Sequence, residues 1–214
     1  MRKFLRFTVG MAILAAWAAP VRSADKATMV PEEGTVEIML LRQKSVRVEL
    51  KLPEATAEKI HKYAAEQWKK AQDVIQLPAN EQEAKFAMME KENERFLEQT
   101  LNAQQRKRLN EITLQVAGLL YVTRQDIASQ LKLTAEQTEQ VRKYQKEAKA
   151  EVEKVIESSK YEQRKEKFTA LSKTSHERLF DVLTDEQETT WKQLTGAPFK
   201  GEFEYAPSRA AAGG

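Results

Sequence analysis

Apolar residues along the chain recur at helical spacing. One stripe advances by three or four residues at a time and closes on two adjacent positions: Val141, Tyr144, Ala148, Val152, Val155 and Ile156. A second stripe of the same kind comprises Phe168, Leu171, Leu179, Val182 and Leu183. Glutamate and lysine fill most of the positions between the members of the first stripe. Because residues three and four apart share one face of a helix, the pattern predicts amphipathic helices with a solvated outer face.

Residues that interrupt helices are sparse. Between Thr35 and Thr195 the chain has one glycine, Gly118, and two prolines, Pro53 and Pro78. Ala, Glu, Lys, Gln, Arg and Leu dominate this stretch, and all are good helix formers. The sequence therefore predicts long helices joined by few turns. The run 112–122 is apolar nearly all round, which predicts a helix enclosed by its neighbours, with a buried strand as the alternative.

The sequence also repeats itself. Shifted by 81 residues, the segment 46–75 aligns with 127–156 without a gap, and nine positions are identical. Shifted by 82 residues, Lys85, Phe86, Lys91, Leu97, Leu101 and Gln105 meet identical residues. The segment 46–52 alternates apolar and polar residues like a strand, but its second copy, 127–133, breaks the alternation at Ser129. Both are therefore predicted to be helical.

These patterns predict an all-α fold of two tandem long helical hairpins, produced by an internal duplication of about 81 residues. The expected organisation is a signal peptide at 1–23, a linker at 24–35, helical repeats at 36–114 and 115–200, and a disordered tail at 201–214. Gly196 is expected to end the last helix, because glycine is common just after a helix and Pro198 prevents continuation.

A five-residue pattern of the form L-T-x-x-Q recurs along the chain. It occurs as Leu133-Thr134-Ala-Glu-Gln137 and as Leu183-Thr184-Asp-Glu-Gln187, with the close variant Leu101-Asn102-Ala-Gln-Gln105. A degenerate copy begins at Leu52. Thr or Asn can accept a hydrogen bond from a first-turn N–H, and the Gln three residues on can reach back to the cap residue. The pattern predicts helix starts with capping boxes, which require no further role.

The N-terminus has the layout of a secretory signal peptide. Residues 1–6 carry three positive charges, an apolar run covers 7–19, and small residues precede a cut after Ser23. An uncleaved anchor is the alternative, but the run is shorter than the ~20 residues of a spanning helix. The whole chain has 35 basic and 32 acidic side chains, a net charge of +3. Removing the four basic residues of 1–23 leaves 31 basic and 32 acidic, or −1, so the basic balance belongs to the leader. We expect a periplasmic or secreted protein without stable membrane insertion.

Candidate chemistry is scarce. The chain has no cysteine, which excludes disulfides, thiolate metal sites and cysteine catalysis. Glu58 and His61 match the Glu-x-x-His spacing of di-iron bundles, but the duplicated position of His61 is Arg142, so the second ligand set is missing. His61 and His176 are both expected at the surface. No nucleophile elbow, phosphate loop or dinucleotide fingerprint occurs. We therefore predict no enzyme activity, catalytic residue, metal or cofactor.

The leader, the helical chain and the repeated boxes resemble the periplasmic LTxxQ-motif family of Spy/CpxP-type helical proteins. The segment 108–118 and residues 183–196 also resemble secreted helical proteins of planctomycete-type bacteria. The resemblance is closest over 101–200. It implies a small antiparallel helical protein, often dimeric, that acts as an ATP-independent chaperone or an envelope-stress regulator. The chain departs from the Spy type in its duplication, its mature charge and its weak first box.

Two aromatic residues stand where the predicted repeats disagree. Trp68 aligns with Lys149, and Phe180 aligns with Glu98, each just off the main stripe. They are either extra packing or an apolar patch for an unfolded client or a partner. The functional hypothesis is a non-enzymatic binding protein, with unfolded or envelope proteins as partners. The alternatives are a structural or regulatory protein with one specific partner and, third, a metal-responsive sensor. The cluster 106–108 is mixed with acids, so we expect no nucleic-acid binding, and a homodimer is left open.

Overall fold

The computed structural model describes residues 35–159 and 161–203. Over these residues the chain is all-α and has no strand, which confirms the predicted fold class. The helices are α1 (Thr35–Leu41), α2 (Lys44–Glu49), α3 (Glu54–Ile75), α4 (Ala79–Thr100), α5 (Ala103–Tyr121), α6 (Gln125–Leu131), α7 (Ala135–Ser158), α8 (Tyr161–Val182) and α9 (Asp185–Thr195). The predicted signal peptide at 1–23, its cut after Ser23 and all but the last residue of the linker lie outside the described residues.

The chain divides into two compact units. The N-terminal unit comprises the described residues 35–110 and 201–203, and the C-terminal unit comprises 111–200. The boundary falls inside α5, which is regular except at Ala117 (φ −112°, ψ 18°), directly before Gly118. A Cβ on Gly118 would lie 2.8 Å from Cζ2 of Trp191, so glycine lets the helix backbone approach this buried ring. The helix kinks at Ala117, next to this glycine, and glycine is a common site of helix kinks.

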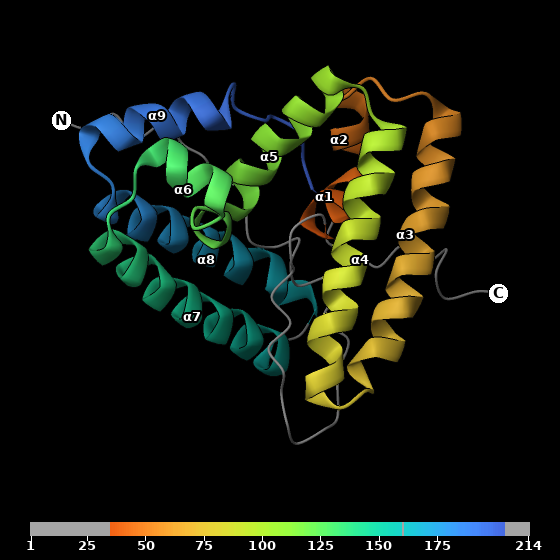
Figure 1. The fold of residues 1–214 in the computed structure, drawn as a ribbon, viewed down its shortest axis with the longest axis horizontal. Coiled ribbons are helices and arrows are strands. Elements are labelled where there is room, and N and C mark those ends of the chain that lie inside the picture. Colours follow the sequence, from red (N-terminus) through yellow and green to blue (C-terminus); the bar gives the residue numbers. More distant parts are fainter. Residues whose placement is uncertain (1–34, 160, 204–214) are drawn as a thin grey trace. The chain divides into compact units, whose positions relative to one another are not determined.

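In the N-terminal unit, α3 and α4 run antiparallel as a hairpin (Figure 1), and α1 packs on both of them. Every residue of α1 after Thr35 is buried, so this short apolar helix forms the centre of the unit's core. Ile60 and Ala64 of α3 and Phe96 and Leu97 of α4 complete it. Residues 201–203, predicted as the start of the disordered tail, belong to this unit. Phe203 is 6% exposed, and the Ser45 hydroxyl donates to the carbonyl of Glu202 at 2.6 Å.

The predicted tail therefore begins too early, because burial of the Phe203 ring holds these three residues in place. The remainder of the tail, 204–214, lies outside the described residues.

In the C-terminal unit, α7 and α8 form a second hairpin, and α6 contacts α9 (Figure 1). The predicted enclosure of 112–122 is confirmed: it forms the second half of α5 and continues to Val122, and only Leu120 escapes full burial between Ile112 and Val122. The segments 46–52 and 127–133, predicted to be helical, are helical in part: α2 covers Lys44–Glu49 and α6 covers Gln125–Leu131, and each helix ends before its segment does. Gly196 ends α9 with φ 63° and ψ −153°, a backbone conformation that is essentially restricted to glycine.

The helix bounds of the two units correspond at the offsets found in the sequence. Adding 82 to the bounds of α4 gives the bounds of α8, and adding 81 to the first residues of α2 and α3 gives those of α6 and α7. Lys51 and Lys132 follow the two short helices, and both have φ 52°. These correspondences support a duplication, which itself remains a prediction.

Candidate functional site

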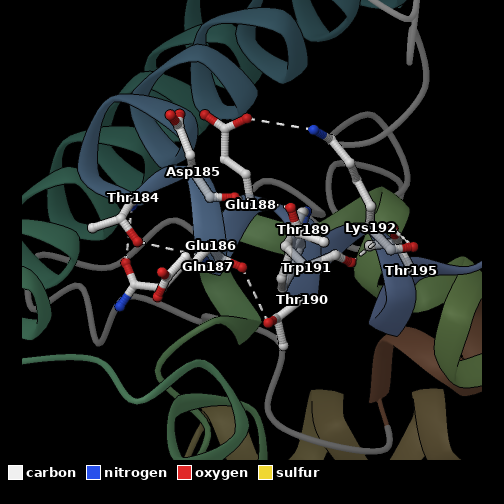
Figure 2. A network of polar contacts seen from close by, with 10 residues as sticks. All are labelled: Thr184, Asp185, Glu186, Gln187, Glu188, Thr189, Thr190, Trp191, Lys192 and Thr195. Atoms are coloured by element: carbon white, nitrogen blue, oxygen red, sulfur yellow. Dashed lines mark hydrogen bonds and ion pairs between the residues drawn. The ribbon is translucent and has the colours of Figure 1, made fainter.

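The boxes of the recurrent motif start helices. The Thr134 hydroxyl accepts from the N–H of Gln137 at 3.1 Å, and the Gln137 Oε1 accepts from the N–H of Thr134 at 3.0 Å. Thr184 and Gln187 form the same reciprocal pair at the start of α9 (Figure 2). The Asn102 side chain plays the part of threonine in the third box, where Gln105 reaches back to the Asn102 N–H at 3.0 Å. The degenerate copy has Pro53 at the cap position and no side-chain cap. Each cap is worth about 1 kcal/mol.

The glutamines of these boxes also join distant helix ends, which sequence reasoning missed. The amide of Gln137 donates to the Val182 carbonyl at the end of α8 (2.9 Å) and to Gln187 Oε1 (2.7 Å). The amide of Gln187 donates to the Leu131 carbonyl at the end of α6 (3.1 Å) and to Gln137 Oε1 (2.9 Å). Each amide thus uses both donors and both acceptor positions. The motif glutamine therefore links its own helix to the end of another helix and also caps its own helix.

The N-terminal unit has half of this arrangement. Gln105 donates to the Leu50 carbonyl at 3.1 Å, just as Gln187 donates to Leu131. The position that corresponds to Gln137 is Thr56, so no second amide is available for pairing. The leading leucines of the motif differ in burial: Leu101 and Leu183 are buried, whereas Leu133 is partly exposed. Since every contact of the boxes described above is internal, the structure gives the motif residues a structural role.

The predicted contact residues are less exposed than expected for a binding patch. Trp68 on α3 and Phe180 on α8 are each partly buried, and each lies in a different unit. Their role as contact residues stays a prediction. Among the described residues, the large apolar side chains that are exposed are instead Val48 on α2 (67%) and Met88 on α4 (59%).

The sequence contained a signal for these two residues. The criterion that selected Trp68 and Phe180, disagreement between the predicted repeats, also applies to Val48 and Met88. At the offsets of 81 and 82, Val48 aligns with Ser129 and Met88 aligns with Ala170. Both exposed apolar side chains thus lie in the N-terminal unit, and the corresponding positions of the C-terminal unit carry smaller side chains.

A cluster of polar contacts links the two helices of the N-terminal hairpin, α3 and α4. Tyr63 stacks on Phe96 with ring centroids 3.7 Å apart and donates to Asn93 Oδ1 at 2.9 Å. Burial, reinforced by the nearby charge of Glu92, raises the pKa of the Tyr63 phenol to about 12. Glu92 itself accepts from Lys70 (2.6 Å) and Gln67 (3.0 Å). The Lys70 hydrogen bond is the leading cause that lowers the pKa of Glu92.

The corresponding place in the C-terminal unit is ionic. Tyr144 aligns with Tyr63, and Arg178 stands where the other unit has Phe96. The Arg178 guanidinium lies 5.6 Å from the centre of the Tyr144 ring and pairs with Glu151 at 3.0 Å. Both hairpins therefore place a planar group against a tyrosine at corresponding positions.

The histidines do not form a site. His61 is exposed, as expected, but the prediction of a surface position for His176 is wrong. His176 is partly buried on α8, where its Nδ1 lies 2.9 Å from the Ser172 carbonyl. Burial lowers the pKa of His176, while hydrogen bonds to the backbone of Ser172 and Gln115 oppose the shift. Within residues 35–159 and 161–203, no three His, Asp or Glu side chains are placed to hold a metal ion.

The basic cluster 106–108 is used internally. The Arg106 guanidinium donates to the Leu101 carbonyl at 2.7 Å and so caps the end of α4. Arg108 pairs with Glu49 of α2 at 2.7 Å. These contacts occupy two of the three cations, and the expectation that the cluster binds no nucleic acid stays a prediction.

Comparison with protein-family models, curated proteins and solved structures finds no match to this chain. In the part of the chain that the structure describes, no helix is both long enough and apolar enough to cross a membrane.

Proposed function

We propose that the protein is a periplasmic or secreted, non-enzymatic binding protein that shields unfolded envelope proteins. The observation that carries the proposal is the exposure of Val48 and Met88, both in one unit, at positions where the other unit has Ser129 and Ala170. The scaffold does not need these side chains, because α6 and α8, the corresponding helices of the C-terminal unit, form without them. The leader and the resemblance to the LTxxQ family support export and the chaperone class.

The chemistry of these two side chains suits weak capture of varied clients. Methionine is unbranched and polarizable, so it adapts to surfaces of different shape. Surfaces of this kind serve proteins that bind many partners. Both residues lie among charged neighbours, Arg47 and Glu49 beside Val48 and Lys85 and Lys91 near Met88, which keep the surface soluble while the apolar group is offered.

The test is an aggregation assay with the chain 24–214 and several unrelated denatured clients. We expect equimolar protein to slow the aggregation of more than one client. The double variant V48S/M88A, which copies the side-chain sizes of the other unit, should lose most of this effect. The matched control S129T/A170S changes exposed positions of the C-terminal unit and should act like the wild type. An absence of protection for every client would refute the chaperone.

A second pair of substitutions tests the aromatic residues. Trp68→Gln and Phe180→Gln should each reduce client protection while helical circular dichroism at 222 nm is retained, if the two residues contact clients. Because both side chains are partly buried, loss of helicity is the contrary outcome and would assign them to packing.

The alternative function is a regulatory or structural protein that docks on one specific envelope partner. The specific observation in its favour is a pair of neighbouring cations on α4, Lys91 and Arg95, beside the exposed Met88. Protection of no client together with saturable binding of one partner would favour this alternative.

A further inference from the structure

We infer that Met88 is a reversible oxidation site and that conversion of its thioether to the sulfoxide switches off client capture; this rests on the proposed binding function. Methionine carries all of the sulfur in this chain, because cysteine is absent. Within the described residues the methionines differ widely in burial. Met39 on α1 is 3% exposed, Met89 on α4 is partly buried, and Met88 on α4 is 59% exposed. An oxidant dissolved in water therefore reaches the Met88 sulfur first.

The reaction is the transfer of one oxygen atom from a peroxide. The Met88 sulfur attacks one oxygen of hydrogen peroxide, so that a sulfur–oxygen bond forms while the oxygen–oxygen bond breaks. The proton on the transferred oxygen passes to the departing hydroxide, which leaves as water. Sulfur loses two electrons and the peroxide gains them, so the reaction needs no other reactant. The product is a polar, chiral sulfoxide in place of a flexible apolar group.

The position of Met88 allows this change without damage to the fold. The buried side chains of α4 include Phe96 and Leu97, whereas Met88 reaches solvent. The corresponding residue of α8 is the exposed Ala170, and α8 forms with a side chain that has no atoms beyond Cβ there. A sulfoxide at Met88 can therefore stay hydrated. Met39 is the contrasting case, because its oxidation would place a polar oxygen among the buried apolar residues of α1.

The same side chain is a client contact in the proposed function. Methionine suits contact with varied partners because it is apolar, unbranched and polarizable, and oxidation to the sulfoxide disrupts such surfaces. The other exposed apolar side chain, Val48, contains no sulfur and stays unchanged. Oxidation thus removes one of the two apolar contacts, as Met88→Ala does. Client capture would then respond to the level of peroxide around the protein.

The first test is the order in which the methionines oxidise. It uses the chain 24–214 with Met29→Leu, so that the remaining methionines of this chain are the three described ones. The folded protein is treated with hydrogen peroxide, and tandem mass spectrometry of its digests assigns each sulfoxide over time. Met88 should oxidise at a rate similar to that of N-acetylmethionine amide. Met39 should react at least about tenfold more slowly, because the fold must open before peroxide reaches it. Equal rates for Met39 and Met88, or faster oxidation of Met89 than of Met88, would overturn the inference.

The second test is client protection by protein that carries the sulfoxide at Met88. In a Met29→Leu, Met89→Leu background, peroxide treatment is stopped with catalase once Met88 has reacted; leucine is the residue that the C-terminal unit has at the position of Met89. Protection should fall to the level of Met88→Ala, while circular dichroism at 222 nm and the urea midpoint stay unchanged. Methionine sulfoxide reductases of both stereospecificities, supplied with dithiothreitol, should restore protection.

The matched control is Met88→Leu in the same background. Leucine keeps an apolar side chain without a thioether, so this variant should protect clients equally before and after peroxide treatment. Undiminished protection by the Met88 sulfoxide protein, or an equal loss in treated Met88→Leu, would overturn the inference.

Failure of this inference can be told apart from failure of the proposed function. If the untreated protein protects clients and the Met88 sulfoxide protein protects them equally well, the switch is refuted and the chaperone stands. If the untreated protein protects no client, the chaperone and the switch are both refuted. The mass spectra then decide by themselves whether Met88 is an oxidation site.

Discussion

The substitution Gln137→Glu separates the two roles of the motif glutamine. Glutamate at this position is the usual partner in a capping box, and its carboxylate would still accept the Thr134 N–H. A negative charge in the first turn is also favourable, by 0.3–1 kcal/mol. A residue that only caps should therefore tolerate the change or gain stability from it. The bridging role predicts the opposite sign.

The expected loss follows from the hydrogen bonds. Glutamate has no donor, so the bonds to the Val182 carbonyl (2.9 Å) and to Gln187 Oε1 (2.7 Å) are lost. At about 1 kcal/mol for each net hydrogen bond, offset by the gain at the helix start, the loss is about 1–2 kcal/mol. The new charge also faces the carbonyl end of α8, which adds to the loss. Gln137→Ala removes all four bonds, and we expect a loss of about 2–3 kcal/mol.

Urea unfolding measures this effect in the C-terminal unit. In a Trp68→Phe background of the chain 24–214, the fluorescence of the buried Trp191 reports this unit by itself. The free energy of unfolding is compared for the wild type, the two Gln137 variants and Gln105→Glu, whose amide has one bridging bond. A Gln137→Glu protein that is as stable as the wild type, or more stable, would refute the bridging role.

Four further predictions address the interior. Burial is the main cause that raises the pKa of the Tyr63 phenol to about 12, so this phenol ionises at lower pH in the unfolded state than in the folded state. The free energy of unfolding should therefore fall from about pH 10 to pH 12. Absorbance at 295 nm should show one tyrosine that ionises at higher pH than the others, and this step should be absent in Tyr63→Phe. Burial lowers the pKa of His176, so on acidification the unfolded state takes up the proton before the folded state does. The free energy of unfolding should therefore fall as the pH drops below about 6.5. In urea titrations at several pH values, His176→Gln should reduce this dependence of stability on pH. Gln115→Leu removes three hydrogen bonds to the end of α9 and the segment that follows it: those with the Thr195 carbonyl (2.6 Å), the Ala197 carbonyl (2.9 Å) and the Phe199 N–H (2.8 Å). The free energy of unfolding should fall by about 2–4 kcal/mol in calorimetry, and a loss below about 1 kcal/mol would contradict this. Lys132 has a left-handed backbone conformation, which is strained for residues other than glycine. Lys132→Gly should therefore raise the free energy of unfolding by about 1 kcal/mol in the same assay, and a decrease would show that the backbone is not strained there.

Much of the fold was predictable because the interactions behind it are local. The box at Thr134 is complete within four residues, and the apolar stripe of α7 needs no partner to be recognised. The left-handed Lys132 was not predicted, because lysine carries no signal for this conformation. The turn forms because the Leu133 N–H can bond back to the Ala128 carbonyl at the end of α6.

The candidate site was harder to predict because exposure is a property of packing. Trp68 and Phe180 were selected as apolar residues off the stripe, yet both are partly buried. Val48 and Met88 differ from their counterparts in the same way and are the side chains that reach solvent. The position of His176 was mispredicted because a histidine beside the stripe is equally compatible with either environment.

By itself the sequence determined where helices start, which faces are apolar and that the chain is all-α, because capping and periodicity act over a few residues. The tertiary structure decided where the side-chain NH2 group of each motif glutamine donates, since Gln137 and Gln187 bond to each other although they are fifty residues apart. It also decided that the carboxylate of Glu92 pairs with Lys70, one helix away. Pairings between helices depend on how the hairpin closes, and no local pattern records that.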